Sequence, residues 1–253
     1  MKTVTTLIIA FLFWSNNSSV SIDPSIIKRF KQIIKFAELD NAKELSKLID
    51  YPLKRENPLP DIKNASDFIA YYPTIFDSSF KRLLKQYNDS VIFEHNGAYG
   101  LVGGNFTGEI WLDADGKISS INYSSKDEQK AKQFLIDKIK KEMYPTVNTW
   151  NENVIVAESE KLLIRVDRTD KGLRYVSWSK GRTTKDRPDI ILYNGAEVAQ
   201  GTMGGWTWTF KNGDWTYIVD DAEMCDDPKN CGLFLELLFK DELKNNIKLT
   251  VIK

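Results

Sequence analysis

One stretch, residues 206–219, has the alternating pattern of a β-hairpin and restricts the fold more than any other part of the chain. Its centre, Asn212-Gly213, is a preferred pair for a two-residue turn. Because strand side chains alternate between two faces, this turn places six large apolar side chains on one face: Trp206, Trp208, Phe210, Trp215, Tyr217 and Val219. The other face is rich in threonine. We therefore expect antiparallel β-structure with one strongly apolar side.

Two interpretations of this aromatic face stay open. It is either the core of a β-domain or an exposed platform that stacks on sugar rings or on a partner protein. On the second interpretation, the candidate ligand-binding residues are Trp206, Trp208, Trp215 and Tyr217.

The region around this hairpin, residues 147–253, is predicted to be a β-rich domain, because short strands follow one another at regular spacing with turn signals between them. Asn194-Gly195 has the composition of a two-residue hairpin turn. The pattern indicates a sandwich or a small barrel. The expected strands before the aromatic hairpin are 154–157, 162–167, 173–178, 189–193 and 197–200.

The preceding residues, 22–125, are predicted to form an α+β domain. Asp23 and Asn41 have the positions of helix N-caps, and apolar residues recur at three-to-four spacing after Asp23. Strands are expected at 91–94, 99–102, 107–113 and 117–123. A capping-box pair, Ser125 and Glu128, then opens a helical connection over residues 126–146. The predicted fold class is α+β, with N-terminal helices packed on a curved antiparallel sheet and a mostly antiparallel β-domain after them.

The first residues, 1–21, have the pattern of a secretory signal peptide. Lys2 is followed by an apolar run over 4–14 and a tract of small polar residues over 15–21. A membrane anchor or a buried helix is the alternative, although the run is shorter than the roughly 20 residues that a spanning helix needs. We expect an exported protein, periplasmic or secreted, without stable membrane insertion.

The two cysteines, Cys225 and Cys231, agree with export. In an oxidising compartment a pair so close in sequence predicts a disulfide, and two free thiols are the alternative. The net charge of zero gives no electrostatic reason to expect a nucleic-acid partner.

Several short pieces resemble uncharacterised secreted or periplasmic bacterial proteins of two domains. They include Tyr51-Pro52-Leu53, Gly108-Glu109-Ile110-Trp111 and Arg174-Tyr175-Val176-Ser177-Trp178. The order of helices and then sheet is similar to a nuclear-transport-factor-2-like cone, in which a sheet curls around a pocket. The resemblance implies a fold and a compartment, and it implies no catalytic residue.

The motifs of common catalytic sites give little support to an enzyme. The chain has one histidine, His95, which lies beside the turn pair Asn96-Gly97. An acidic run after the aromatic hairpin, Asp220 to Asp227, suggests either a solvated loop, a calcium site or an acidic finger for a basic partner. Asp113 and Asp115 are a carboxylate pair in a turn. We assign no catalytic residue, metal ligand or cofactor.

These observations favour an exported, non-enzymatic binding protein of the cell envelope, such as an inhibitor or an immunity-type partner of another protein. The alternative is a binder of small molecules or carbohydrate, which uses the cone pocket or the aromatic hairpin. A carboxylate-based hydrolase is the class that the sequence favours least.

Overall fold

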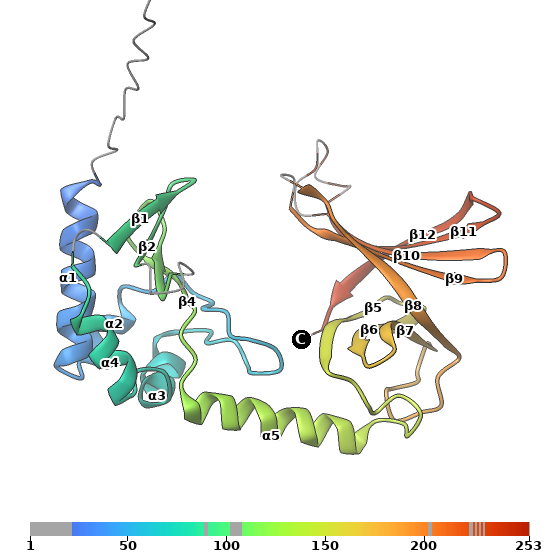
Figure 1. Cartoon of the computed structure of the whole chain (residues 1–253), viewed down its shortest axis with the longest axis horizontal. Helices are drawn as coiled ribbons and strands as arrows, with labels where there is room; N and C mark the ends of the chain where they lie inside the picture. Colours follow the sequence, from blue (N-terminus) through green and yellow to red (C-terminus); the bar gives the residue numbers. More distant parts are fainter. Residues whose placement is uncertain are drawn as a thin grey trace, which may run out of the picture. The chain divides into compact units, whose positions relative to one another are not determined.

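The computed structural model describes residues 22–88, 91–101, 108–201, 204–222, 225, 227, 229 and 231–252. The expected signal segment, 1–21, lies outside these described residues. The described chain is α+β, as predicted, and it divides into two units (Figure 1). The first unit joins Met1–Tyr51 to Phe76–Tyr123, and the second joins Pro52–Ile75 to Ser124–Lys253. The segment 52–75 is therefore grouped with the β-rich part of the chain.

The first unit contains helices and an antiparallel sheet of four strands in the order β1-β2-β3-β4. The expected caps form: Asp23 accepts from the backbone N–H of Ser25 at 2.7 Å, and Asn41 accepts from that of Glu44 at 3.2 Å. The apolar stripe of the first helix is buried, as its spacing predicts. The elements are α1 (Pro24–Glu38), α2 (Ala42–Ser46), α4 (Ser78–Lys85), β1 (Ile92–His95), β2 (Ala98–Leu101), β3 (Ile110–Leu112) and β4 (Ile118–Ile121).

The second unit contains two helices, α3 (Ala65–Ile75) and α5 (Lys126–Glu142). Ser125 caps α5 and accepts from the backbone N–H of Glu128 at 3.0 Å. The Glu128 carboxylate is fully buried and accepts from Arg55 Nε at 2.7 Å and from Tyr71 Oη at 3.2 Å. These contacts attach the segment 52–75 to α5. Among the helices that the structure describes, none combines the length and the apolar content needed to cross a membrane.

Eight antiparallel strands of the second unit close into a barrel, drawn yellow to red in Figure 1. Each strand pairs with the next along the chain, and the pairs Thr250–Glu158 and Val251–Ala157 close the ring. Of the two predicted alternatives, the structure is therefore a barrel. Its strands are β5 (Glu152–Glu158), β6 (Leu162–Thr169), β7 (Gly172–Ser179), β8 (Ile190–Ala199), β9 (Trp206–Asn212), β10 (Trp215–Ala222), β11 (Gly232–Phe239) and β12 (Glu242–Val251).

Side chains fill the barrel interior, which is the usual outcome for eight strands. Ile164, Val166 and Tyr175 belong to this core. Alternate residues of β6 and β7 face the outside of the barrel, yet they are buried as well. A second apolar cluster covers this outer face, and it consists of Met143, Val147, Trp150, Val176 and Trp178. The residues that follow α5 thus form a second layer on the barrel wall.

The prediction of a hairpin turn at Asn194-Gly195 is wrong. Both residues lie inside β8, which pairs with β7 up to Gly195 and with β9 from Ala196 onward. Asn194 has a φ of 58°, and the register shifts at this point, so the pair forms a bulge that bends the strand. An added Cβ on Gly195 would lie 2.2 Å from Cε1 of Phe210. Gly195 is required for close packing where the strand changes partner.

Candidate functional site

The aromatic hairpin forms, but its turn lies one residue further along the chain than expected. Trp215 pairs with Asn212 and Tyr217 with Phe210, so the turn consists of Gly213 and Asp214. Gly213 has a φ of 59°, which suits the first central position of a two-residue turn. The shift moves each partner by two residues, and the six aromatic and apolar side chains therefore remain on one face, as predicted.

The four candidate ligand-binding residues of this face differ in their exposure to solvent. Trp208 is 4% exposed and lies in the barrel core, and Tyr217 packs against that core. Trp206 and Trp215 are 43% and 37% exposed. The interior and the surface interpretations thus apply to different residues of the same strand pair.

The disulfide and the acidic run lie beyond β10. Cys225 and Cys231 are at bonding distance with Cα atoms 5.5 Å apart, so the predicted pair forms. Asp220 accepts from Thr207 Oγ1 at 2.9 Å within the barrel wall. Glu223 and Asp226, which belong to the proposed calcium ligands, lie outside the described residues. In the described parts of the chain, no three His, Cys, Asp or Glu side chains are grouped as a metal site.

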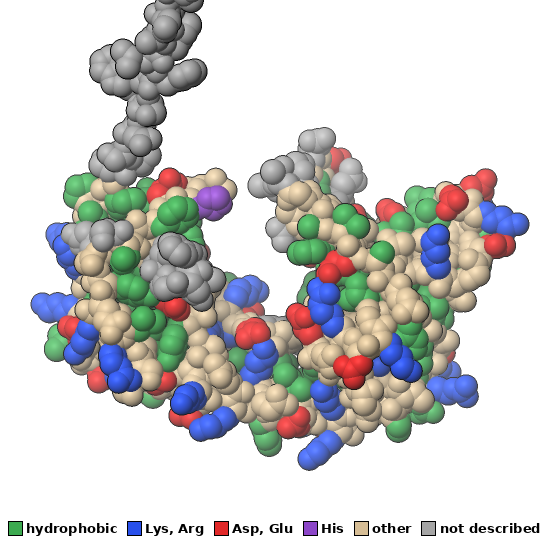
Figure 2. Space-filling model, viewed as in Figure 1, with side chains coloured by type: hydrophobic (Ala, Val, Ile, Leu, Met, Phe, Trp, Pro, Cys, Tyr) green, Lys and Arg blue, Asp and Glu red, His purple; other side chains and the backbone are tan. Residues whose placement is uncertain are grey.

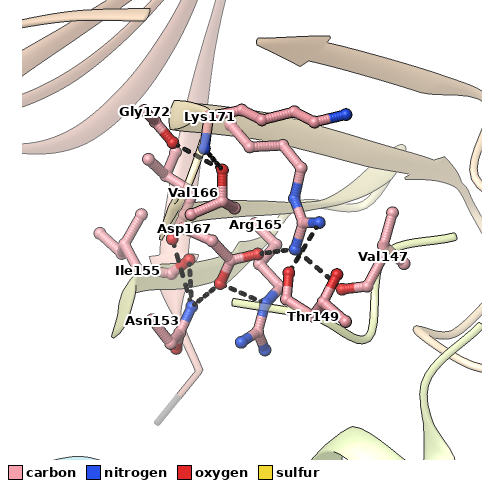
Figure 3. Close-up of polar contacts among 11 residues, drawn as sticks. Val147, Thr149, Asn153, Ile155, Arg165, Val166, Asp167, Lys171 and Gly172 are labelled. Atoms are coloured by element: carbon pink, nitrogen blue, oxygen red, sulfur yellow. Dashed lines mark hydrogen bonds and ion pairs between the residues drawn. The ribbon is translucent and has the colours of Figure 1, made fainter. Parts of the chain in front are cut away.

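A buried polar cluster on the outer face of β6 and β7 was not predicted. Asp167 is fully buried between two guanidiniums, and Arg165 and Arg174 are 3% and 1% exposed. Asp167 Oδ1 accepts from Arg165 Nε at 2.7 Å, and Oδ2 accepts from Arg174 Nη2 at 2.8 Å. Arg174 Nη2 also donates to the Val147 carbonyl at 2.8 Å, and Nη1 donates to that of Thr149 at 3.2 Å (Figure 3). The cluster therefore attaches the covering layer to the barrel wall.

Arg165 and Arg174 are both incompletely satisfied, since Nε of Arg174 is also buried without a hydrogen-bond partner in the described chain. The Nη2 of Arg165 is buried without a hydrogen-bond partner among the described residues, and Figure 3 shows its terminal nitrogens pointing away from Asp167. The guanidinium carbon lies 4.7 Å from the centre of the Trp150 ring, a cation–π distance. The Nε1 of Trp150 is also buried without a partner in the described chain. Burial lowers the pKa of Arg165, Asp167 opposes that shift, and Arg174 adds to it.

Arg165 and Trp150 line a cavity of about 140 Å³ in the second unit. Its apolar wall consists of Pro58, Ile136 and Ile139, together with the Trp150 ring. Amide side chains supply hydrogen-bonding groups, and they are Asn57, Asn151 and Asn153. The cavity wall is therefore mostly polar, with one apolar side.

The other charged side chains of the cavity wall have ion-pair partners. Lys132 pairs with Glu56, and Glu152 accepts from Arg168 Nε at 2.9 Å. Asn57 Nδ2 donates to Asn153 Oδ1 at 3.0 Å, and Asn153 Nδ2 donates to Asp167 Oδ1 at 3.1 Å. On the face that Figure 2 shows, charges of both signs are interspersed. Among the described residues of this cavity wall, Arg165 and Trp150 are the two with a buried N–H nitrogen that has no hydrogen-bond partner.

The site was not predicted, because the pattern of residues 162–167 indicates a strand and nothing more. Alternation correctly separates Ile164 from Arg165, and it cannot show whether a second layer covers the outer face. One signal was present. Val176 and Trp178 share a face with Arg174, and two large apolar residues on that face indicate a covered surface.

Comparison of the chain with protein-family models, with curated proteins and with solved structures found no match.

Proposed function

We propose that the chain is an exported, non-enzymatic binding protein whose second unit holds a small polar molecule in the cavity beside Arg165. One observation carries the proposal: Arg165 lines a cavity, is 3% exposed, and has a buried Nη2 without a hydrogen-bond partner in the described chain. An unsatisfied buried donor costs about 1–3 kcal/mol, and more when it is charged. A ligand oxygen would remove that cost.

The state of the cavity carboxylates favours binding over hydrolysis. Acid–base work on a glycoside needs two carboxylates that are free to exchange protons across a cleft. Glu56 and Glu152 are instead engaged by Lys132 and Arg168. Asp113, of the carboxylate pair considered from the sequence, accepts from the backbone N–H groups of Asp115 and Lys117 and holds its own turn.

A cavity-filling variant tests the proposal. We would record ligand-observed NMR spectra of the purified chain with a panel of small alcohols, amides, acids and sugars. Ile136→Trp fills the cavity from α5, and Phe134→Trp is the matched control, because Phe134 is 69% exposed on the same helix. We expect at least one compound to bind the wild type and the control but not Ile136→Trp. No binding at all, or binding that Ile136→Trp leaves unchanged, contradicts the proposal.

Export and the fold of the first unit are part of the same proposal. The apolar run near the N-terminus and the bonded pair Cys225–Cys231 support a periplasmic or secreted protein. The order of helices and then a four-stranded antiparallel sheet supports a nuclear-transport-factor-2-like first unit.

A second candidate function is recognition of carbohydrate or of an envelope protein by the exposed aromatic side chains. The Trp215 ring lies 5.1 Å from that of Phe239, and Trp215 remains 37% exposed. Trp206 is the other exposed residue of the hairpin face. An array of oligosaccharides, probed with the wild type and with Trp206→Ala and Trp215→Ala, tests the sugar-binding form. Binding that both variants retain in full excludes these rings as the site.

A further inference from the structure

The buried cluster on the barrel wall carries an unbalanced positive charge. Arg165 and Arg174 are two guanidiniums, and Asp167 is the only carboxylate among the described residues that forms an ion pair with either of them. Both oxygens of Asp167 are occupied, and the other acceptors of Arg174 are neutral backbone carbonyls. Arginine keeps its proton in proteins. One positive charge is thus buried without a counter-charge in the cluster, an arrangement that is costly unless another group pairs with it.

Among the described residues, neither carboxylate of the cavity wall, Glu56 or Glu152, forms an ion pair with Arg165. Glu56 faces Lys132, and Glu152 faces Arg168, which also donates to Glu197. A further positive charge lies near the Trp150 ring, because Lys140 Nζ is 4.6 Å from the ring centre.

We infer that the ligand of this cavity is a small organic carboxylate, with its oxygens on the Arg165 guanidinium; this inference rests on the proposed function. A guanidinium with unused N–H groups matches the geometry of a carboxylate. Trp150, another residue of the cavity wall, has an indole Nε1 that also lacks a partner in the described chain.

The size and the walls of the cavity restrict which acids can bind in it. A cavity of about 150 Å³ holds one benzene ring in a protein core, and this cavity measures about 140 Å³. Pro58, Ile136 and Ile139 offer an apolar surface to the body of the ligand. A short aliphatic acid or a single-ring aromatic acid satisfies both requirements, whereas inorganic phosphate would leave the apolar wall without contacts.

Acid–amide pairs of equal shape test the charge requirement directly. Isothermal titration calorimetry with the purified chain would compare butyrate with butyramide and benzoate with benzamide, with inorganic phosphate as a further probe. We expect an acid to bind at least about tenfold more tightly than its amide, the size of a charge-assisted contact. Arg165→Gln should remove that preference, and Arg182→Gln, at an exposed arginine of the same unit, should keep it.

Each other outcome has a defined meaning. If amides bind as tightly as acids and Ile136→Trp blocks both, the cavity is a ligand site and the carboxylate inference is wrong. If phosphate binds there and neither acid does, the inference is wrong in the same way. If no compound binds, the inference and the proposed function fail together. The acid–amide comparison on the wild type needs no variant, so it tests the carboxylate inference even if Arg165→Gln does not fold.

Discussion

At the scale of single residues, we expect Asp167 to stabilise the folded state and the charge of Arg165 not to stabilise it. Asp167→Asn would leave two buried guanidiniums without a counter-charge, so we expect a loss of about 3–5 kcal/mol in the free energy of unfolding. Arg165→Met removes the surplus charge, keeps the Asp167–Arg174 pair, and fills similar space beside Trp150, so we expect a change below about 1 kcal/mol. Urea unfolding followed by tryptophan fluorescence measures both. Equal losses in the two variants would contradict a surplus charge at Arg165.

Tyr71 gives a prediction on pH. Its pKa is raised to about 12, first by burial and then by the charge of Glu128 and the hydrogen bond to it, while Arg55 opposes the shift. The unfolded chain ionises its tyrosines near pH 10, so this contribution to stability is complete below pH 10 and is lost between pH 10 and 12. The loss of stability between pH 9 and pH 11 should therefore be smaller in Tyr71→Phe than in the wild type. Urea midpoints at the two pH values measure it, and equal losses contradict the assignment.

At the scale of elements, the bend in β8 depends on the absence of a side chain at Gly195. Gly195→Ala would place Cβ against the Phe210 ring, and we expect a loss of about 1–3 kcal/mol from overpacking. The double variant with Phe210→Leu relieves the contact, so the cost of the alanine should fall in that background. Thermal unfolding of the four proteins of this cycle measures the coupling. An alanine that costs the same in both backgrounds shows that the ring is not the reason for the glycine.

Elements set by near neighbours were predictable from the sequence. The caps at Asp23, Asn41 and Ser125 depend on residues a few positions apart. Asn194-Gly195 was misinterpreted because a tight turn and a bulge both use a positive φ, and the choice depends on the distant ring of Phe210. Local patterns therefore predict where the backbone adopts a positive φ, but they do not show whether that residue belongs to a turn or to a bulge.

At the scale of the whole chain, the parts that could not be predicted join distant residues. Val251 pairs with Ala157 to close the barrel, and Asn57 bonds to Asn153 beside the cavity. Arg165 was not identified as a site residue, because the layer that covers it, around Val147 and Trp150, belongs to another segment. The candidate site consists of such long-range contacts, so no motif of consecutive residues identifies it.

The chain passes between its two units three times, because Pro52–Ile75 is part of the second unit. A protease site inserted between Tyr123 and Ser124 would therefore cut the backbone without freeing the barrel. We expect the two fragments to co-elute in size-exclusion chromatography, since Arg55 and Tyr71 remain bonded to the buried Glu128. Arg55→Glu replaces that attraction by repulsion between buried carboxylates, so the same cut should now release the fragments. Fragments that separate without this substitution would show that 52–75 is not held by the barrel unit.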